Sequence, residues 1–295
     1  MPKIVDGKKL AEEIKDELKK DIAAFGKKIK LAVIYIGGNT ASESFIKRKK
    51  VFGASVGVEV EVKKPKEETW KSREKLRARI SQITHDKKNT GVIIQLPLPD
   101  EIKQRTPYIL DSISANKDVD VLSSEAVGKL TNGRMDIIPP VAGAIKYIVE
   151  KNNIELNGKN IVVVGEGSLV GKPVALWLLS QRLPFAVLTS KSPNFSETIA
   201  RADVIISGVG KAGLIKKDMV KDGVIAIDAG TSGDSGQLKG DFEPDVAEKT
   251  SLFTPVPGGV GPLTVAMLFK NLVILSKKLN TECLVNIDRY GYNNS

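Results

Sequence analysis

A glycine-rich turn in the second half of the chain has the residue types that bind phosphate. The segment GEGSLVG runs from Gly165 to Gly171, after the strand pattern NIVVVG and before the helical pattern KPVALWLL. The N–H groups at the start of that helix would therefore face a ligand beside the turn. The spacing is GxGxxxG rather than GxGxxG. At the first strand of a βαβ unit such a turn predicts dinucleotide binding, and an ordinary strand-to-helix connection is the alternative.

The end of the next strand pattern, FAVLT, bears on the choice of dinucleotide. A carboxylate that prefers an unphosphorylated ribose usually stands about 20 residues after the glycine turn. Here the chain reads Ser190, Lys191 and Ser192 instead. Hydroxyls and a cation favour a 2′-phosphate, so we expect NADP. Glu166 would repel that phosphate if it pointed inward, so NAD stays an alternative.

A second loop with unusual chemistry lies near the C-terminus, where residues 254–264 read TPVPGGVGPLT. Glycine lets a backbone approach a partner closely, and proline restricts the loop to few shapes. The loop therefore predicts a preorganised surface of main-chain N–H and C=O groups for a flat or anionic ligand. A tight connection before a helix is the alternative.

The scarce residues limit the chemistry. The chain has one histidine, His85, and one cysteine, Cys283. An intramolecular disulfide, a thiolate metal cluster and a multi-histidine metal site are excluded, and we expect no bound metal. We interpret both residues as bystanders. Acid-base chemistry must then come mainly from Lys, Asp, Glu or Tyr.

The charge favours anionic ligands of small size. The chain carries 45 Lys and Arg against 35 Asp and Glu, for a net charge of +10. Nucleic acid would be one partner for such a charge. However, the lysines are scattered along amphipathic helices, aromatic residues are only 5% of the chain, and we find no nucleic-acid motif. We expect neither a nucleic-acid nor a membrane partner, and the absence of a signal-peptide pattern predicts a cytoplasmic protein.

The elements that position these residues alternate between helix and strand. A chain of 295 residues suggests two domains of about 130 to 150 residues each. In the first half we expect helices over 10–22, 40–55 and 72–84, and strands over 30–38, 56–62 and 91–99. In the second half we expect helices over 142–151, 170–179 and 196–202, and strands over 160–165, 185–189, 204–210 and 224–230. This βαβ rhythm predicts an α/β protein whose second domain is a Rossmann-type doubly wound parallel sheet.

Six motif segments follow one another along the chain in this order: SESFIKRK, GVIIQLPLP, KDVD, GEGSLVGKP, GVGKAG and PVPGGVGPLT. On these segments the chain resembles the bifunctional methylenetetrahydrofolate dehydrogenase/methenyltetrahydrofolate cyclohydrolase family over nearly its whole length. The resemblance implies a substrate and catalytic domain over 1–138, onto which a C-terminal helix over 265–295 packs back. It also implies an NAD(P)-binding Rossmann domain over 139–264, a folate cleft between the domains, and a homodimer.

The resemblance also implies roles for particular residues. Lys49 matches the acid-base lysine, Gln95 the glutamine that contacts it, and Asp120 the aspartate that anchors the amino edge of the pterin. Phe45, four residues before Lys49 and so on the same helical face, replaces a tyrosine and can stack on the substrate without offering a hydroxyl. Further substrate contacts are implied for Leu96, Pro97, Pro257, Gly258 and Gly259. Cofactor contacts are implied for Gly165, Glu166, Gly167, Ser168, Val170, Gly171, Ser190, Lys191, Ser192, Gly208, Val209, Gly210, Gly230, Thr231, Gly261 and Thr264.

Three departures from the family pattern accompany these matches. Val121 stands where glycine is usual, PPVAGA with Val141 replaces PCTPxG, and Gly167 stands where serine is common. The resemblance implies oxidation of methylenetetrahydrofolate with NADP⁺ and hydrolysis of the product to 10-formyltetrahydrofolate. A dehydrogenase with weakened cyclohydrolase activity is one alternative, and a noncatalytic dinucleotide-binding module is another.

Overall fold

The computed structural model describes residues 2–38, 40–234 and 237–290. Side chains are described within these ranges except at 40, 41, 234, 237 and 279–290, so the side chain of Cys283 lies outside the described part. The chain forms two compact units. Unit 1 comprises Met1–Glu13 and Ile138–Met267, and unit 2 comprises Ile14–Ile137 and Leu268–Ser295.

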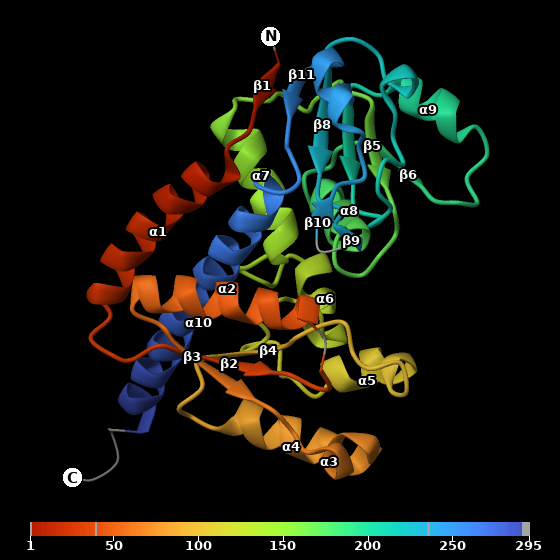
Figure 1. Ribbon diagram of the computed structural model, residues 1–295. Coiled ribbons are helices and arrows are strands. Elements are labelled where there is room, and N and C mark those ends of the chain that lie inside the picture. The colour runs from red at the N-terminus through yellow and green to blue at the C-terminus, as the bar shows by residue number, and fades with distance from the viewer. Residues whose placement is uncertain (1, 39, 235–236, 291–295) are drawn as a thin grey trace. The chain divides into compact units, whose positions relative to one another are not determined.

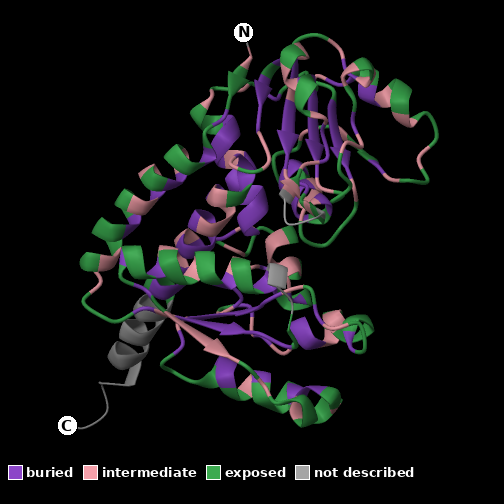
Figure 2. Ribbon diagram, viewed as in Figure 1, coloured by how far each residue is buried: buried purple, intermediate pink, exposed green. Residues whose placement is uncertain are grey.

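Unit 1 is built on a six-stranded parallel sheet in the order β1-β11-β8-β7-β5-β6 (Figure 1). The strands are β1 (Lys3–Ile4), β5 (Ile161–Val164), β6 (Phe185–Leu188), β7 (Val204–Ser207), β8 (Val224–Asp228) and β11 (Thr250–Phe253). Strands β5 and β7 are buried along their whole length, which is why they read as unbroken apolar runs (Figure 2). The sheet confirms the predicted doubly wound α/β fold.

Short elements complete unit 1. The helices are α7 (Pro140–Lys151), α8 (Gly171–Ser180) and α9 (Phe195–Arg201), with 3₁₀ turns η2 (Lys217–Met219) and η3 (Pro244–Lys249). A two-stranded hairpin joins β9 (Ser232–Asp234) to β10 (Gln237–Lys239). Val162, Ile205 and Ala226 of the sheet pack with Ile199 of α9 and Phe242 in one core cluster.

Unit 2 contains a three-stranded parallel sheet in the order β3-β2-β4. Its strands are β2 (Lys30–Ile34), β3 (Glu59–Lys63) and β4 (Gly91–Ile94). Its helices are α2 (Thr40–Val56), α3 (Glu67–Lys71), α4 (Arg73–His85), α5 (Thr106–Leu110) and α6 (Ser124–Thr131), with the 3₁₀ turn η1 (Lys103–Arg105) before α5. Ala32, Ile80, Val92 and Ile109 belong to its core. His85 is exposed at the last position of α4.

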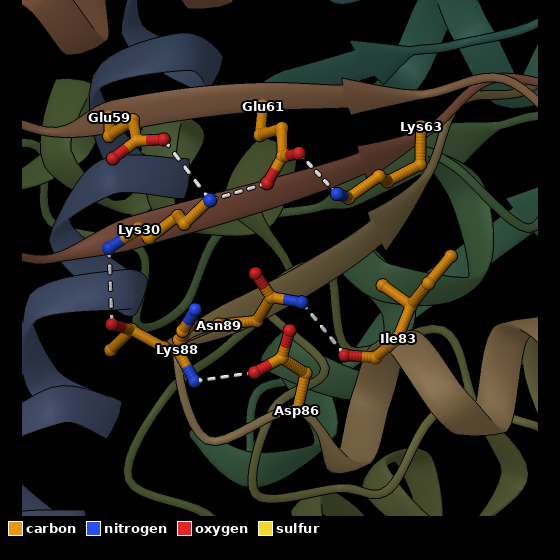
Figure 3. Close-up of polar contacts among 9 residues, drawn as sticks. Lys30, Glu59, Glu61, Lys63, Ile83, Asp86, Lys88 and Asn89 are labelled. Atoms are coloured by element: carbon orange, nitrogen blue, oxygen red, sulfur yellow. Dashed lines mark hydrogen bonds and ion pairs between the residues drawn. The ribbon is translucent and has the colours of Figure 1, made fainter.

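Polar contacts fasten the edges of the β3-β2-β4 sheet (Figure 3). Lys30 of β2 pairs with Glu59 at 3.1 Å and with Glu61, which also pairs with Lys63. Hydrogen bonds from Lys30 and Lys63 lower the pKa of Glu61. Between α4 and β4, the Asn89 side chain donates to the carbonyl of Ile83 at 2.8 Å. The ion pairs hold β3 beside the central strand β2, and the Asn89 bond fastens the loop before β4 to helix α4.

The first residues of the chain form a strand that sequence patterns did not predict. Lys3 and Ile4 pair with Leu252 and Phe253 of β11, so residues 1–13 belong to unit 1, whereas the sequence predicted 1–138 as one domain. A two-residue strand is too short to have a hydrophobic period. The strand partner that places it lies about 250 residues away, as the paired residue numbers show.

Two helices, α1 (Gly7–Ala23) and α10 (Val260–Tyr290), pass from one unit to the other. In unit 2, Phe269 of α10 lies against Phe52 of α2, with ring centroids 5.1 Å apart, and the Asn271 side chain donates to the carbonyl of Val119 at 3.0 Å. The segment Val260–Lys278 matches a membrane-spanning helix by length and composition, with mean hydropathy 1.3, but 61% of the apolar stretch is buried. We assign it as a core helix.

Candidate active site

Lys49 and Gln95 lie in direct contact in unit 2. Lys49 is on α2, one turn after Phe45, and Gln95 follows the last residue of β4. The Lys49 ammonium donates to Gln95 Oε1 at 2.7 Å. Gln95 is only 6% exposed, and its amide nitrogen donates to the Leu96 carbonyl at 2.7 Å. That second bond orients the amide so that its oxygen is directed at the lysine.

Asp120 completes this group, and burial shifts the pKa of both charged residues. Burial raises the pKa of Asp120 to about 6, although the neighbouring charge of Lys49 opposes the rise. Burial likewise lowers the pKa of Lys49, and the charge of Asp120 opposes that change. For both side chains, burial makes the charged form less stable than it is in water. A lysine of this kind can take and release a proton nearer to neutral pH.

Asp118 is a further residue of the site that the sequence analysis did not single out. It is 2% exposed and accepts hydrogen bonds from the backbone N–H groups of Leu122 at 2.9 Å and Ser123 at 2.7 Å. The backbone of Asp118 also pairs with Val92 of β4 in an isolated parallel β-bridge. These contacts fix the loop that carries Asp120 beside β4, the strand that Gln95 directly follows. The available sequence signal was the second carboxylate of the KDVD segment, two residues before Asp120.

The glycine-rich turn in unit 1 has the geometry of an anion site. It follows β5, and Gly165 has φ 105°, a conformation that L side chains rarely adopt. A methyl group added at Gly171 would lie 2.1 Å from the Gly165 carbonyl oxygen. Helix α8 starts at Gly171 with no side-chain cap. The Lys172 N–H donates to the Gly167 carbonyl at 3.0 Å, but no described acceptor engages the N–H groups of residues 166–171, which are available to a ligand. Glu166, Gly167 and Ser168 are exposed at this turn, and the residues fit a dinucleotide pyrophosphate.

The remaining predicted cofactor residues of the sheet lie along the same edge. The register aligns Val164 with Leu188 and Ser207, and Ser207 with Asp228. The segments that directly follow these strands carry Ser190–Ser192, Gly208–Gly210 and Gly230–Thr231. After β6, two side-chain bonds help to close the turn: Ser192 Oγ accepts from the Thr189 N–H at 2.9 Å, and Thr189 Oγ1 accepts from the Lys191 N–H at 3.2 Å. Lys191 is exposed there.

The proline-glycine loop uses its glycines for contacts inside the protein. The Gly7 N–H donates to the Gly258 carbonyl at 2.9 Å, and the Gly259 N–H donates to the Pro255 carbonyl at 2.7 Å. A methyl group added at Gly7 would lie 1.8 Å from the Gly259 carbonyl oxygen. The sequence analysis missed Gly7 as the partner of this loop. Gly261 has open space beside it, and Thr264 donates to the Val260 carbonyl at 3.1 Å.

The comparisons with known proteins agree with this arrangement. Residues 5–120 match the family model "Tetrahydrofolate dehydrogenase/cyclohydrolase, catalytic domain", and residues 139–280 match its "NAD(P)-binding domain". Bifunctional protein FolD of Lactobacillus gasseri is 40% identical over 283 residues, which cover 94% of this chain and 99% of that protein. The chain belongs to the tetrahydrofolate dehydrogenase/cyclohydrolase family. The resemblance found in the motifs is therefore confirmed.

Solved structures of this family have the same fold. The bifunctional enzyme FolD from Campylobacter jejuni is 36% identical, with a TM-score of 0.88 over 95% of this chain and 100% of that one. The Trypanosoma brucei dehydrogenase-cyclohydrolase, complexed with NADP cofactor and inhibitor, is 29% identical, with a TM-score of 0.87 over 94% and 98% of the two chains. This chain therefore contains an NAD(P)-binding domain and a tetrahydrofolate dehydrogenase/cyclohydrolase catalytic domain.

Two departures from the tetrahydrofolate dehydrogenase/cyclohydrolase pattern border Lys49 and Asp120. Val121 is 1% exposed and has φ 57°, a left-handed conformation that strains a β-branched residue and that glycine adopts freely. This backbone angle explains the glycine that the family usually has there. Phe45 is partly buried, with the Arg48 guanidinium 5.5 Å from its ring centroid. Val141 is buried in the first turn of α7, in unit 1.

Proposed function

We propose that this protein oxidises 5,10-methylenetetrahydrofolate with NADP⁺ and hydrolyses the resulting 5,10-methenyltetrahydrofolate to 10-formyltetrahydrofolate. The observation that supports the proposal is the 2.7 Å contact between Lys49 and Gln95 beside Asp120, because it holds a lysine of lowered pKa against an oriented amide oxygen. The relative from Lactobacillus gasseri, named a bifunctional protein, supports the pairing of two activities.

Hydrolysis places the greater demand on the chain's own side chains. Water adds to the cationic bridging carbon, and neutral Lys49 takes a proton from it. The carbon–nitrogen bond then breaks as Lys49 returns a proton to the departing nitrogen, and one proton passes to solvent overall. Gln95 keeps the lysine in place through its oriented amide oxygen. Asp120 would hold the amino edge of the pterin so that the reacting carbon stays near Lys49.

Oxidation requires mainly alignment. NADP⁺ supplies the hydride acceptor when it is bound. The turn from Gly165 to Gly171 and the uncapped start of α8 would hold its pyrophosphate, and Lys191 would contact its 2′-phosphate. Reacting atoms must come within about 3 to 3.5 Å, which a site of restrained loops can maintain. Pro257, Gly258 and Gly259 remain proposed substrate contacts.

The deciding experiment is an assay of the purified full chain with methylenetetrahydrofolate and NADP⁺ or NAD⁺. We expect NADPH absorbance to rise, methenyltetrahydrofolate to decay faster than its spontaneous rate, and NADP⁺ to be preferred. Lys191→Ala should raise the KM for NADP⁺ about tenfold, because it removes a charged phosphate contact, and should leave the KM for NAD⁺ unchanged. Lys159→Ala, on the exposed loop before β5, is the matched control.

The same assay separates the alternatives. Reduced cofactor without accelerated methenyltetrahydrofolate decay would identify a dehydrogenase-only member, which the missing hydroxyl at Phe45 would favour. Failure to reduce either cofactor would overturn the proposal and favour a noncatalytic module.

We also infer a cytoplasmic homodimer, in keeping with the family resemblance. Sedimentation equilibrium should give twice the monomer mass. A monomer at assay concentrations would contradict this.

A further inference from the structure

Two carboxylates in unit 1 are fully buried and take no part in the chemistry described above. Asp228, the last residue of β8, is 1% exposed, and Asp241, which follows β10, is 0% exposed. Burial raises the pKa of Asp228 to about 7, and the nearby charge of Asp241 adds to the rise. Carboxylates are seldom fully buried unless bonded partners compensate for the loss of water. The hydrogen-bond donors to Asp228 and Asp241 therefore show which parts of the fold the two carboxylates stabilise.

Asp241 holds the turn that follows β7. Its Oδ2 accepts from the Ser207 hydroxyl at 2.6 Å and from the Val209 N–H at 2.7 Å, and its Oδ1 accepts from the Lys211 N–H at 2.8 Å. The Gly208 N–H donates to the Val164 carbonyl at 3.0 Å. Three N–H groups of this turn are thus directed into the protein.

Asp228 holds the turn that follows β8. Its Oδ1 accepts from the Gly230 N–H at 3.0 Å, and its Oδ2 accepts from the Phe242 N–H at 3.0 Å. Its own N–H donates to Thr254 Oγ1 at 2.7 Å, at the start of the proline-glycine loop. A methyl group added at Gly230 would lie 2.2 Å from the Asp241 carboxylate. The two carboxylates therefore brace neighbouring turns as one unit.

The two turns present carbonyl acceptors to a ligand, because most of their N–H groups are already bonded inside the protein. Besides the N–H groups bonded to Asp241 and Asp228, the Ala229 N–H donates to the Ser207 carbonyl at 2.8 Å. Within the described residues, by contrast, no donor reaches the carbonyl oxygens of Gly208, Val209 or Gly230. Carbonyl oxygens accept hydrogen bonds from hydroxyl and amide groups and cannot bind phosphate oxygens. The turn before α8 differs, because the N–H groups of residues 166–171 donate to no acceptor among the described residues.

The strand order shows which part of a dinucleotide would meet these turns. The sheet runs β6-β5-β7-β8 at this side. With the pyrophosphate at the turn after β5 and the adenosine half toward β6, the nicotinamide half must extend over β7 and β8. This step rests on the proposed function.

We propose that Asp241 and Asp228 are positioning residues for the nicotinamide half of the cofactor. By accepting from the N–H groups of Val209, Lys211 and Gly230, they shape a carbonyl-lined surface that accepts hydrogen bonds from ribose hydroxyls and the carboxamide and disfavours phosphate. Phosphate recognition is left to the turns after β5 and β6.

The test measures binding of two ligands to the full chain by isothermal titration calorimetry. NADP⁺ contains both halves, and 2′,5′-ADP contains the phosphates of the adenosine half without the nicotinamide riboside. Asp241→Asn keeps the size of the side chain but replaces an acceptor with a donor. We expect its Kd for NADP⁺ to rise about tenfold or more, since a bond to a charged group is lost, while its Kd for 2′,5′-ADP changes less than about twofold. In assays, the KM for NADP⁺ should rise and the KM for folate should not.

Two further variants keep the test decisive. Ser207→Ala removes one donor to Asp241 and should show the same selectivity with a smaller effect, even if Asp241→Asn folds poorly. Asp203→Asn is the control: its carboxylate accepts from the Asn160 N–H at 2.7 Å at the opposite end of β7, so both Kd values should stay unchanged. The inference would be overturned if Asp241→Asn weakened the binding of both ligands equally or left the binding of NADP⁺ unchanged. Weaker binding of NADP⁺ by Asp203→Asn would also overturn it. If the unmodified protein binds neither ligand, the proposed function itself fails.

Discussion

The contact between Lys49 and Gln95 matters because the two proposed reactions differ in their need for proton transfer. Hydride transfer moves no proton to the reacting carbon, whereas hydrolysis must handle protons at water and at a leaving nitrogen. Burial lowers the pKa of Lys49, which makes the neutral amine more accessible than on an exposed lysine. Substitution of Lys49 should therefore slow hydrolysis much more than oxidation.

Lys49→Gln should lower the hydrolysis rate about 10²- to 10⁴-fold, because glutamine keeps length and polarity but cannot titrate. Dehydrogenase activity should keep a substantial share of its rate. Both activities are measured on one preparation, with folate affinity measured separately. Lys50→Gln, exposed on the same helix, is the control and should match the unmodified protein. Hydrolysis at the parent rate above the spontaneous background would remove Lys49 from the mechanism.

Asp120 should make stability depend on pH in a predictable direction. Its pKa is raised from 3.8 to about 6 on folding, so between these values the folded protein binds more protons than the unfolded chain. The contribution is full below the unfolded pKa and is lost as pH rises through the folded pKa. Asp120→Asn cannot ionise. The free energy of unfolding of the parent minus that of the variant should therefore fall between pH 3.8 and about 6, as measured by urea titration. A difference independent of pH would show that Asp120 is not desolvated.

At the scale of elements, the first turn of α1 and the proline-glycine loop form one packed joint. The Gly7 N–H bonds to Gly258, and the Cα of Gly7 lies so close to Gly259 that no side chain fits. Asp6 Oδ1 accepts from the N–H groups of Lys8 and Lys9 at 3.1 and 3.0 Å and so caps the helix. The loop is thus shaped from inside by a helix that begins near the N-terminus.

Gly7→Ala should destabilise the protein by about 1 to 3 kcal/mol or more, because the clash is with backbone that cannot rotate away. Gly128→Ala is the matched control: Gly128 lies in α6, with nothing within 4 Å of the added methyl group. That change should raise the free energy of unfolding by about 0.5 to 1 kcal/mol, since glycine is unfavourable within helices. Urea denaturation measures both. Equal effects of the two substitutions would show that the joint relaxes freely.

At the scale of the whole molecule, each unit has a core of its own. Val162, Ile205 and Phe242 belong to the core of unit 1, and Ile80 and Val92 to that of unit 2. A ligand that binds one unit stabilises it by mass action. The cofactor should therefore act on the unit that contains the predicted dinucleotide turn.

NADP⁺ at about 100 times its Kd should add about 2.7 kcal/mol to the free energy of unfolding of unit 1. In hydrogen exchange, amides of β5 and β7 should be protected accordingly, and those of β2 and β4 should change less. An equal gain of protection in all four strands would indicate that the two units open together. No change in β5 and β7 would contradict cofactor binding at this sheet.

The sequence by itself determined the features that short segments encode. Buried strands such as 161–164 and 204–207 read as apolar runs because parallel strands are covered on both faces. The glycine turn after residue 164 followed from its place between a strand and a helix. Lys49, Gln95 and Asp120 followed from motif matches, and Val121 was recognised as a departure. Each of these depends on neighbours close in the chain.

Only the tertiary structure decided which distant groups meet. Strand β1 exists because Lys3 and Ile4 pair with β11, and Gly7 is constrained because Gly259 lies against it. Asp241 differs from an ordinary loop aspartate because Ser207, Val209 and Lys211 converge on it from 30 or more positions away. The lowered pKa of Lys49 likewise comes from burial, which its helix alone does not provide. Such interactions depend on chain segments that folding brings together, and a local sequence pattern does not show which distant residues become neighbours.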